Sequence, residues 1–189
     1  MVTVDYIFNN FKISDEEYAE LDCKFGQLCY FVAQDLKRKN SKNNFTDEIE
    51  DIAQDLRWSL SRAGVYTKRQ KYIEDSLSVI KQYVKNSFVK MVIEELEGLW
   101  DERTKHGANR QKFGFWQEQI LDTLLTKYVP EDKRPNKESK LNIDEKFSRY
   151  CKAIIWNQSK NLGKKITKER NIRNQCVSLS EFDFLADTL

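Results

Sequence analysis

The feature that most constrains this chain is an amphipathic segment at residues 142–173, NIDEKFSRYCKAIIWNQSKNLGKKITKERNIR. At 100° per residue, its large apolar side chains fall on one side with Gln158 as the only polar interruption: Phe147, Cys151, Ile154, Ile155 and Leu162. The other side is basic, and between Lys146 and Arg173 there are nine Lys or Arg residues and one acid, Glu169. The pattern predicts one long helix with a buried side and a cationic side.

Trp156 falls in the middle of the cationic side, and two interpretations are open. A surface helix can carry lysines whose stems cover apolar surface, together with one half-buried tryptophan. Alternatively, the lysines bind phosphates and the ring stacks on a base, which is the interpretation that we favour. The candidate DNA-binding residues are then Arg149, Lys152, Trp156, Asn157, Lys160, Lys164, Lys165, Lys168 and Arg170.

Composition favours an all-α fold. The 189 residues include only six Gly and two Pro, strand-like alternation is scarce, and apolar residues recur at spacings of three and four. The formal net charge of +2 conceals strong local polarity, because residues 46–55 are acidic and residues 146–173 are basic. Local charge is therefore more informative about partners than the net charge.

Several functional classes are disfavoured. No apolar run approaches the roughly 20 residues of a membrane span, and the N-terminus lacks the basic start and apolar core of a signal peptide. The four cysteines are scattered without a Cys-x-x-Cys pair, which is typical of a reducing compartment. We therefore expect a cytoplasmic protein that does not bind membranes.

Catalytic and metal-binding patterns are also missing. The only histidine, His106, falls in the predicted loop 104–114, which lacks the Gly-Lys-Ser/Thr ending of a phosphate-binding loop. Glu48, Asp51 and Asp55 share one helix face, but no second helix offers a matching carboxylate and histidine motif. We expect no enzyme activity, no cofactor and no metal.

Local signals divide the chain into further helices. Ser14 and Glu17 form a capping box that opens a helix to about residue 39, and Thr46 is predicted to cap the next helix. Gly64 is predicted to end that helix, followed by one long helix or two over 67–98 and a short helix over 115–128 with Trp116 on its apolar side. A linker at 129–140 precedes the organising helix, whose predicted cap is Asn142 with Glu145.

Two further segments carry candidate contact residues. The outer face of the predicted helix after Thr46 carries Asp51, Gln54, Asp55 and Trp58, where the ring either anchors a partner or is covered by a neighbouring element of the chain. The last residues, SLSEFDFLADTL, carry Leu179, Phe182, Phe184 and Leu185 among acids. This tail either folds back onto its own helices or enters an apolar pocket of a partner.

Three stretches together resemble the bacterial RNA polymerase sigma factors of the sigma-70 superfamily: LDCKFGQLCYFVAQDL at 21–36, TDEIEDIAQDLRWSLSRA at 46–63, and KFSRYCKAIIWNQSKNLGKKITKER at 146–170. The second is similar to the acidic helix that holds the polymerase core, and the third to the helix that melts and recognises the promoter −10 element. Within the superfamily, the chain most resembles the small late-transcription factors of T-even-type tailed phages. Such factors end in a tail that docks on the DNA sliding clamp.

The resemblance implies a helical sigma-core-like domain with an inserted helical segment. Residues 1–64 would be its first part, 65–141 a helical insert and linker without a counterpart, 142–175 the promoter-binding helix and 176–189 the anchor tail. The implied partners are RNA polymerase core, promoter DNA and a sliding clamp, in a host bacterial cytoplasm if the chain is viral. The alternative is a non-catalytic helical protein that binds nucleic acid or regulates without polymerase.

Overall fold

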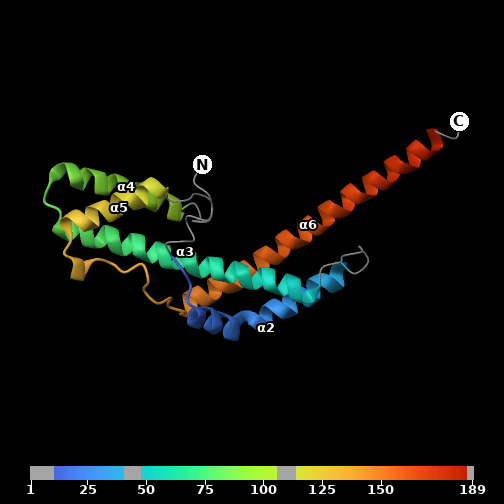
Figure 1. Cartoon of the computed structure of the whole chain (residues 1–189), viewed down its shortest axis with the longest axis horizontal. Helices are drawn as coiled ribbons and strands as arrows, with labels where there is room; N and C mark the ends of the chain where they lie inside the picture. The colour runs from blue at the N-terminus through green and yellow to red at the C-terminus, as the bar shows by residue number, and fades with distance from the viewer. Residues whose placement is uncertain (1–10, 41–47, 106–113, 187–189) are drawn as a thin grey trace. The chain divides into compact units, whose positions relative to one another are not determined.

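The computed structural model describes residues 11–40, 48–105 and 114–186, without the side chains of 103–105, 115, 170 and 173–186. Within these ranges the chain is all-α, as predicted, and contains no strand. The helices are α2 (Asp15–Asn40), α3 (Ile49–Tyr83), α4 (Ser87–Lys105), α5 (Phe115–Tyr128), the 3-10 helix η2 (Glu131–Lys133) and α6 (Glu145–Ala186) (Figure 1). Thr46 and His106 lie outside the described residues.

The helices form two compact units that are not contiguous in sequence. The first unit comprises the described residues up to Ile13 together with 64–141, and the second comprises 14–63 together with the residues from Asn142 onward. Helix α3 contributes its first half to the second unit and its second half to the first. The segment 65–141 therefore lies in a different unit from the three stretches that carry the sigma resemblance, and it shares that unit with Gly64 and the described residues up to Ile13.

In the second unit, α2 packs against α6 and the first half of α3. The predicted capping box opens α2: the Ser14 amide donates to Glu17 Oε2 (2.9 Å) and the Glu17 amide donates to Ser14 Oγ (3.2 Å). Three acids in its first turn and three bases in its last turn suit the helix dipole. Its core includes Leu21, Phe25, Cys29, Val32, Leu36, Leu56, Leu60, Phe147, Cys151 and Ile155.

Helix α6 begins two residues later than predicted. Asp144 Oδ1 accepts a hydrogen bond from the Phe147 amide (2.7 Å), so Asp144, and not Asn142, provides the side-chain cap. Ile166 is the last buried residue of α6 whose side chain is described. The helix then continues to Ala186 and extends beyond α2 (Figure 1), so the first eleven residues of the segment 176–189 continue the helix.

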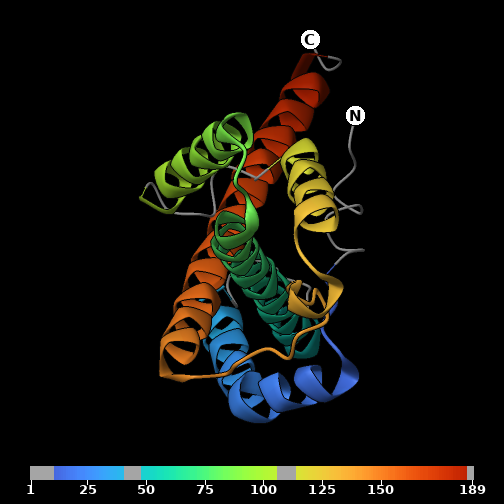
Figure 2. The same cartoon turned by 90° about the vertical axis from the view of Figure 1, so that its left-hand side faces the viewer.

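In the first unit, α4 and α5 both lie against the second half of α3 (Figures 1 and 2). Its core includes Ile73, Leu77, Ile80, Ile93, Leu96, Leu121 and Leu125. An ion pair between Arg69 and Glu118 (3.0 Å) is buried between α3 and α5. Asp122 accepts from both Tyr72 Oη (2.6 Å) and Lys137 Nζ (2.6 Å), which ties the linker back onto the same two helices.

Two predictions for this region are wrong. Helix α3 does not end at Gly64 but runs through it to Tyr83. A Cβ at Gly64 would lie 2.4 Å from Ile13 Cδ1 and 3.1 Å from Leu141 Cδ2, so this glycine serves close packing and not a helix end. The helix over Phe115–Tyr128 has the predicted bounds, but Trp116 points to solvent with 57% of its surface exposed.

Candidate nucleic-acid and protein interfaces

The cationic side of α6 is exposed, as its periodicity predicts. Lys152, Lys160, Lys164 and Lys168 are all exposed, and Trp156 between them keeps 50% of its surface accessible. Asn157 is exposed next to the ring. Because the opposite side of α6 is buried against α2, these side chains are free to meet a ligand along one edge of the second unit.

Not every predicted DNA-binding residue shares this side. Lys165 is five residues from Lys160, so it projects about 140° away around the helix, and its Nζ lies 3.9 Å from Glu169 Oε1. Arg149 is on the cationic side and pairs with Glu145 (2.6 Å), but both side chains are largely exposed, so the pair is weak and can exchange for a phosphate. The side chain of Arg170 lies outside the described part of α6.

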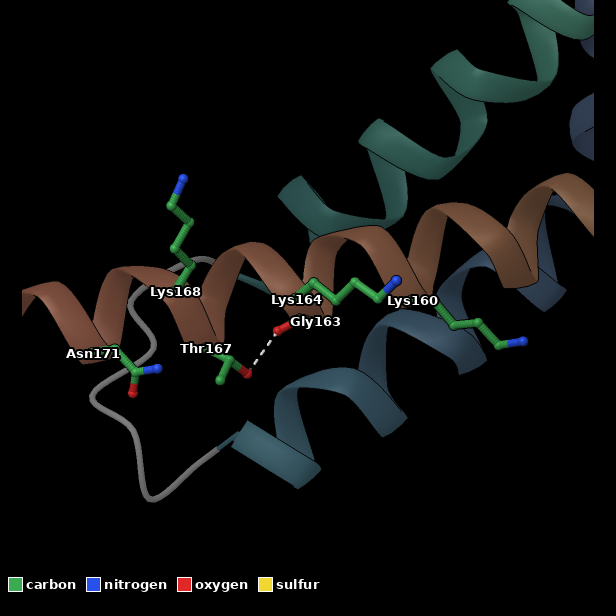
Figure 3. Close-up of a pocket in the computed structure, with 6 residues that line it drawn as sticks. All are labelled: Lys160, Gly163, Lys164, Thr167, Lys168 and Asn171. Atoms are coloured by element: carbon green, nitrogen blue, oxygen red, sulfur yellow. Dashed lines mark hydrogen bonds between the residues drawn. The ribbon is translucent and has the colours of Figure 1, made fainter. Parts of the chain in front are cut away.

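A shallow depression of about 530 Å³ lies along the cationic side (Figure 3). Its described lining comes from α6 alone: Lys160, Gly163, Lys164, Thr167, Lys168 and Asn171. Apart from its chain neighbours and the adjoining helix backbone, no described residue has an atom within 4 Å of the position of a Cβ at Gly163, so the helix surface is open there. Thr167 Oγ1 donates to the Gly163 carbonyl (3.0 Å).

The sequence prediction missed Gly163, Thr167 and Asn171 because, C-terminal to Asn157, it selected only basic residues. Thr167 and Asn171 lie on the same side of the helix in Figure 3, at spacings of seven and eleven residues from Lys160. The same helical periodicity that selected the lysines would have found both. Their hydroxyl and amide groups add hydrogen-bonding capacity to a face that otherwise supplies positive charge.

The acidic face of α3 is the second candidate surface. Asp51, Gln54 and Asp55 are exposed, and Trp58 keeps 58% of its surface accessible, so no described element of the chain covers it. The Arg62 guanidinium stacks on the ring, with Cζ 4.0 Å from its centre. A cation–π contact of this kind holds the ring on the surface in a defined orientation.

The first half of α3 and Glu48, the residue directly before it, form two ion pairs with α2. Arg57 Nε donates to Asp22 Oδ1 (2.7 Å), and Lys37 Nζ lies 3.0 Å from Glu48 Oε2. The buried face of this helix half packs Ile52, Leu56 and Leu60 into the second unit. The helix that carries the acidic face is therefore held by ion pairs to α2 and by packing of its opposite face.

The tail residues Leu179, Phe182, Phe184 and Leu185 belong to α6, but their side chains lie outside the described residues. Among the side chains that are described, no group of three or more His, Cys, Asp or Glu could hold a metal ion. None of the described helices combines the length and apolarity that a membrane crossing requires.

The sequence matches no protein-family model, and no curated protein or solved structure is significantly similar to it.

Proposed function

We propose that this chain is a non-enzymatic transcription-initiation factor of the sigma type. In this proposal, the acidic face of α3 binds RNA polymerase core and the cationic side of α6 binds promoter DNA. The observation that carries the proposal is that one compact unit presents two half-exposed tryptophans on surfaces of opposite charge, Trp58 among acids and Trp156 among lysines.

The two surfaces suit two different ligands. An acidic face repels the DNA backbone, so its exposed ring fits a basic protein surface, where a desolvated tryptophan is a typical anchor. The lysines of α6 attract phosphates, and an aromatic ring among them can stack on an unpaired base. A factor that brings a polymerase to DNA and opens the duplex needs both kinds of contact.

The resemblance of the three sequence stretches to sigma-70 factors supports this assignment, because two of them contain these two surfaces. By the same resemblance, we propose that Leu179, Phe182, Phe184 and Leu185 dock on a DNA sliding clamp and couple initiation to it. The alternative, a nucleic-acid-binding or regulatory helical protein that acts without polymerase, accounts for the cationic side but leaves the exposed Trp58 without a role.

Direct measurement of polymerase binding distinguishes the two functions. Purified bacterial core polymerase is titrated into the chain carrying a dye on the exposed Cys23, and anisotropy is recorded. Trp58→Ala should weaken binding about 30-fold, which corresponds to loss of an anchor of about 2 kcal/mol, and Asp55→Arg should weaken it as well.

Trp116→Ala is the matched control, because this tryptophan is equally exposed but belongs to the first unit. It should leave core binding unchanged, and circular dichroism should show the same helical content in all variants. Equal binding of the wild type, Trp58→Ala and Asp55→Arg would support the alternative function instead.

A further inference from the structure

The first unit exposes large apolar side chains at the start of α4. Phe88 and Met91 keep 67% and 56% of their surfaces accessible. Asn86 caps this helix, since its Oδ1 accepts from the amides of Phe88 (2.9 Å) and Val89 (3.2 Å). The two apolar side chains are therefore presented on a well-formed helical turn, while Ile93, Leu96 and Trp100 fill the core behind them.

The exposed side of α4 continues as a row with alternating spacings of three and four residues. The row is Phe88, Met91, Glu95, Gly98 and Glu102, and each of these residues is exposed. This alternation is the spacing by which one helix lies along another. The row ends in acids, and Glu94 is exposed beside it.

At Gly98 the row has no side chain, so the backbone of α4 is exposed there. Apart from its chain neighbours and the adjoining helix backbone, no described residue has an atom within 4 Å of the position of a Cβ on Gly98, so packing within the described part of the chain does not require a glycine there. A glycine in a helix interior costs about 1 kcal/mol relative to alanine. The distance between two packed helices depends on the side chains at their contact, so a bare position allows a partner helix to approach closely.

We propose that this face of α4 is a docking surface for a basic amphipathic helix of a partner protein. Phe88 and Met91 would be the apolar anchors, Gly98 the point of closest approach, and Glu95 and Glu102 the groups that face the partner's lysines or arginines. The acids disfavour nucleic acid and anionic membrane as occupants. They also disfavour the same face of a second copy, because like charges would oppose each other.

The test uses a defined probe and the full-length chain. The probe is a fluorescent synthetic peptide of about three heptads with leucine at the first and fourth positions and lysine or arginine at the flanking positions. A second peptide carries glutamate in place of every basic residue. The basic peptide should bind and the acidic one should not, and binding of the basic peptide should weaken as salt is added.

Gly98→Lys is the informative variant, because it adds bulk and positive charge at an exposed position where a Cβ would contact no other described part of the chain. It should retain or raise thermal stability, since lysine is a better helix former than glycine, and weaken peptide binding about tenfold or more. Phe88→Ala should weaken it similarly. Glu74→Lys, a charge reversal at an exposed position of α3 in the same unit, and Trp58→Ala in the other unit should both leave binding unchanged.

Peptide binding that survives both Gly98→Lys and Phe88→Ala would overturn the proposal, as would equal binding of the basic and acidic peptides. Sedimentation equilibrium of the chain alone tests whether the surface binds a second copy of the chain. Self-association that Gly98→Lys abolishes would assign the surface to a second copy and likewise overturn the proposal. None of these results depends on polymerase, so failure here and failure of the sigma-type function are separable.

Discussion

At the scale of single residues, a substitution of Trp156 distinguishes a base-stacking site from an ordinary surface helix. Half of its surface is exposed, so Trp156→Ala should change the free energy of unfolding little. Stacking on a base is worth about 1–3 kcal/mol, and we therefore expect the variant to slow promoter opening more than it weakens binding to closed duplex. The measurement is the rate of opening, followed by a fluorescent base analogue in the melted region.

Trp116→Ala again serves as the control, with a similarly exposed ring (57% against 50% for Trp156) in the other unit, and it should leave the opening rate unchanged. If Trp156→Ala mainly lowers thermal stability and leaves the opening rate unaltered, the ring belongs to the packing of α6 and does not stack on a base.

The buried cysteines give the second unit a pH dependence. Burial raises the pKa of Cys29 to about 11 and that of Cys151 to about 12, from an ordinary value of 9.0. Between pH 9 and these values the unfolded chain binds fewer protons than the folded chain, so the free energy of unfolding should fall as pH rises. Well below pH 9 the two thiols are protonated in both states and contribute no slope.

Urea unfolding at pH 8.5 and 10.5 should therefore show a smaller loss of stability for the variant Cys29→Ala, Cys151→Ala than for the wild type. The comparison removes the contribution of other groups that titrate in this range. An identical loss in both proteins would mean that the thiols are not held protonated by burial between α2 and α6.

At the scale of elements, the cationic side of α6 is predicted to bind through charge. If about four phosphates are neutralised, the logarithm of the affinity should fall with the logarithm of salt at a slope near −3 to −4. Within the polymerase complex, the double reversal Lys160→Glu, Lys164→Glu should abolish promoter binding and leave helical content unchanged. Filter binding or anisotropy over a salt series measures both the salt dependence of the affinity and the loss of promoter binding in the double variant.

Lys165→Glu is the matched control, because Lys165 is exposed on the same helix but projects away from Lys160. It should reduce promoter binding far less than the double reversal. Full binding by the double variant would exclude this side of α6 as the DNA contact.

The tail at 176–189 is predicted to anchor the chain to a sliding clamp and not to belong to the hydrophobic core of the fold. Deleting 179–189 should leave the affinity for polymerase core and the thermal stability nearly unchanged, because Ile166 is the last buried residue among the described side chains of α6. Clamp-stimulated transcription should be lost, since the apolar rings would carry most of the docking energy. A truncated chain that unfolds, or one that still responds fully to the clamp, would contradict the anchor role.

The elements that sequence alone could predict are those that local chemistry determines. The Ser14–Glu17 capping box, the bounds of α5 and the exposed lysines of α6 all follow from short-range rules. Gly64 was mispredicted because a glycine that ends a helix and one that admits Ile13 and Leu141 look the same in sequence. Trp116 was misplaced because hydrophobicity alone does not reveal which apolar side chains remain at the surface.

At the scale of the whole molecule, the chain combines two compact units, and the three stretches on which the proposed sigma-type function rests all fall in the second unit. Helix α3 links them without a break through Gly64. Sequence could not indicate that residues up to Ile13 join 64–141, because that association depends on contacts between segments far apart in the chain, such as the hydrogen bond from Lys68 Nζ to the Lys12 carbonyl (2.8 Å). In the proposed function, the candidate polymerase and DNA surfaces both lie in the second unit, and the proposed docking surface on α4 lies in the first.

In the proposed function, this chain directs a polymerase to defined DNA positions. The most direct measurement is mapping of transcript 5′ ends after a single round of synthesis by bacterial core polymerase on a randomised template pool, with and without the chain. We predict starts that depend on the chain, share an upstream sequence, and disappear with Trp58→Ala or the Lys160→Glu, Lys164→Glu variant. Starts that are equally frequent and equally scattered with and without the chain would contradict it.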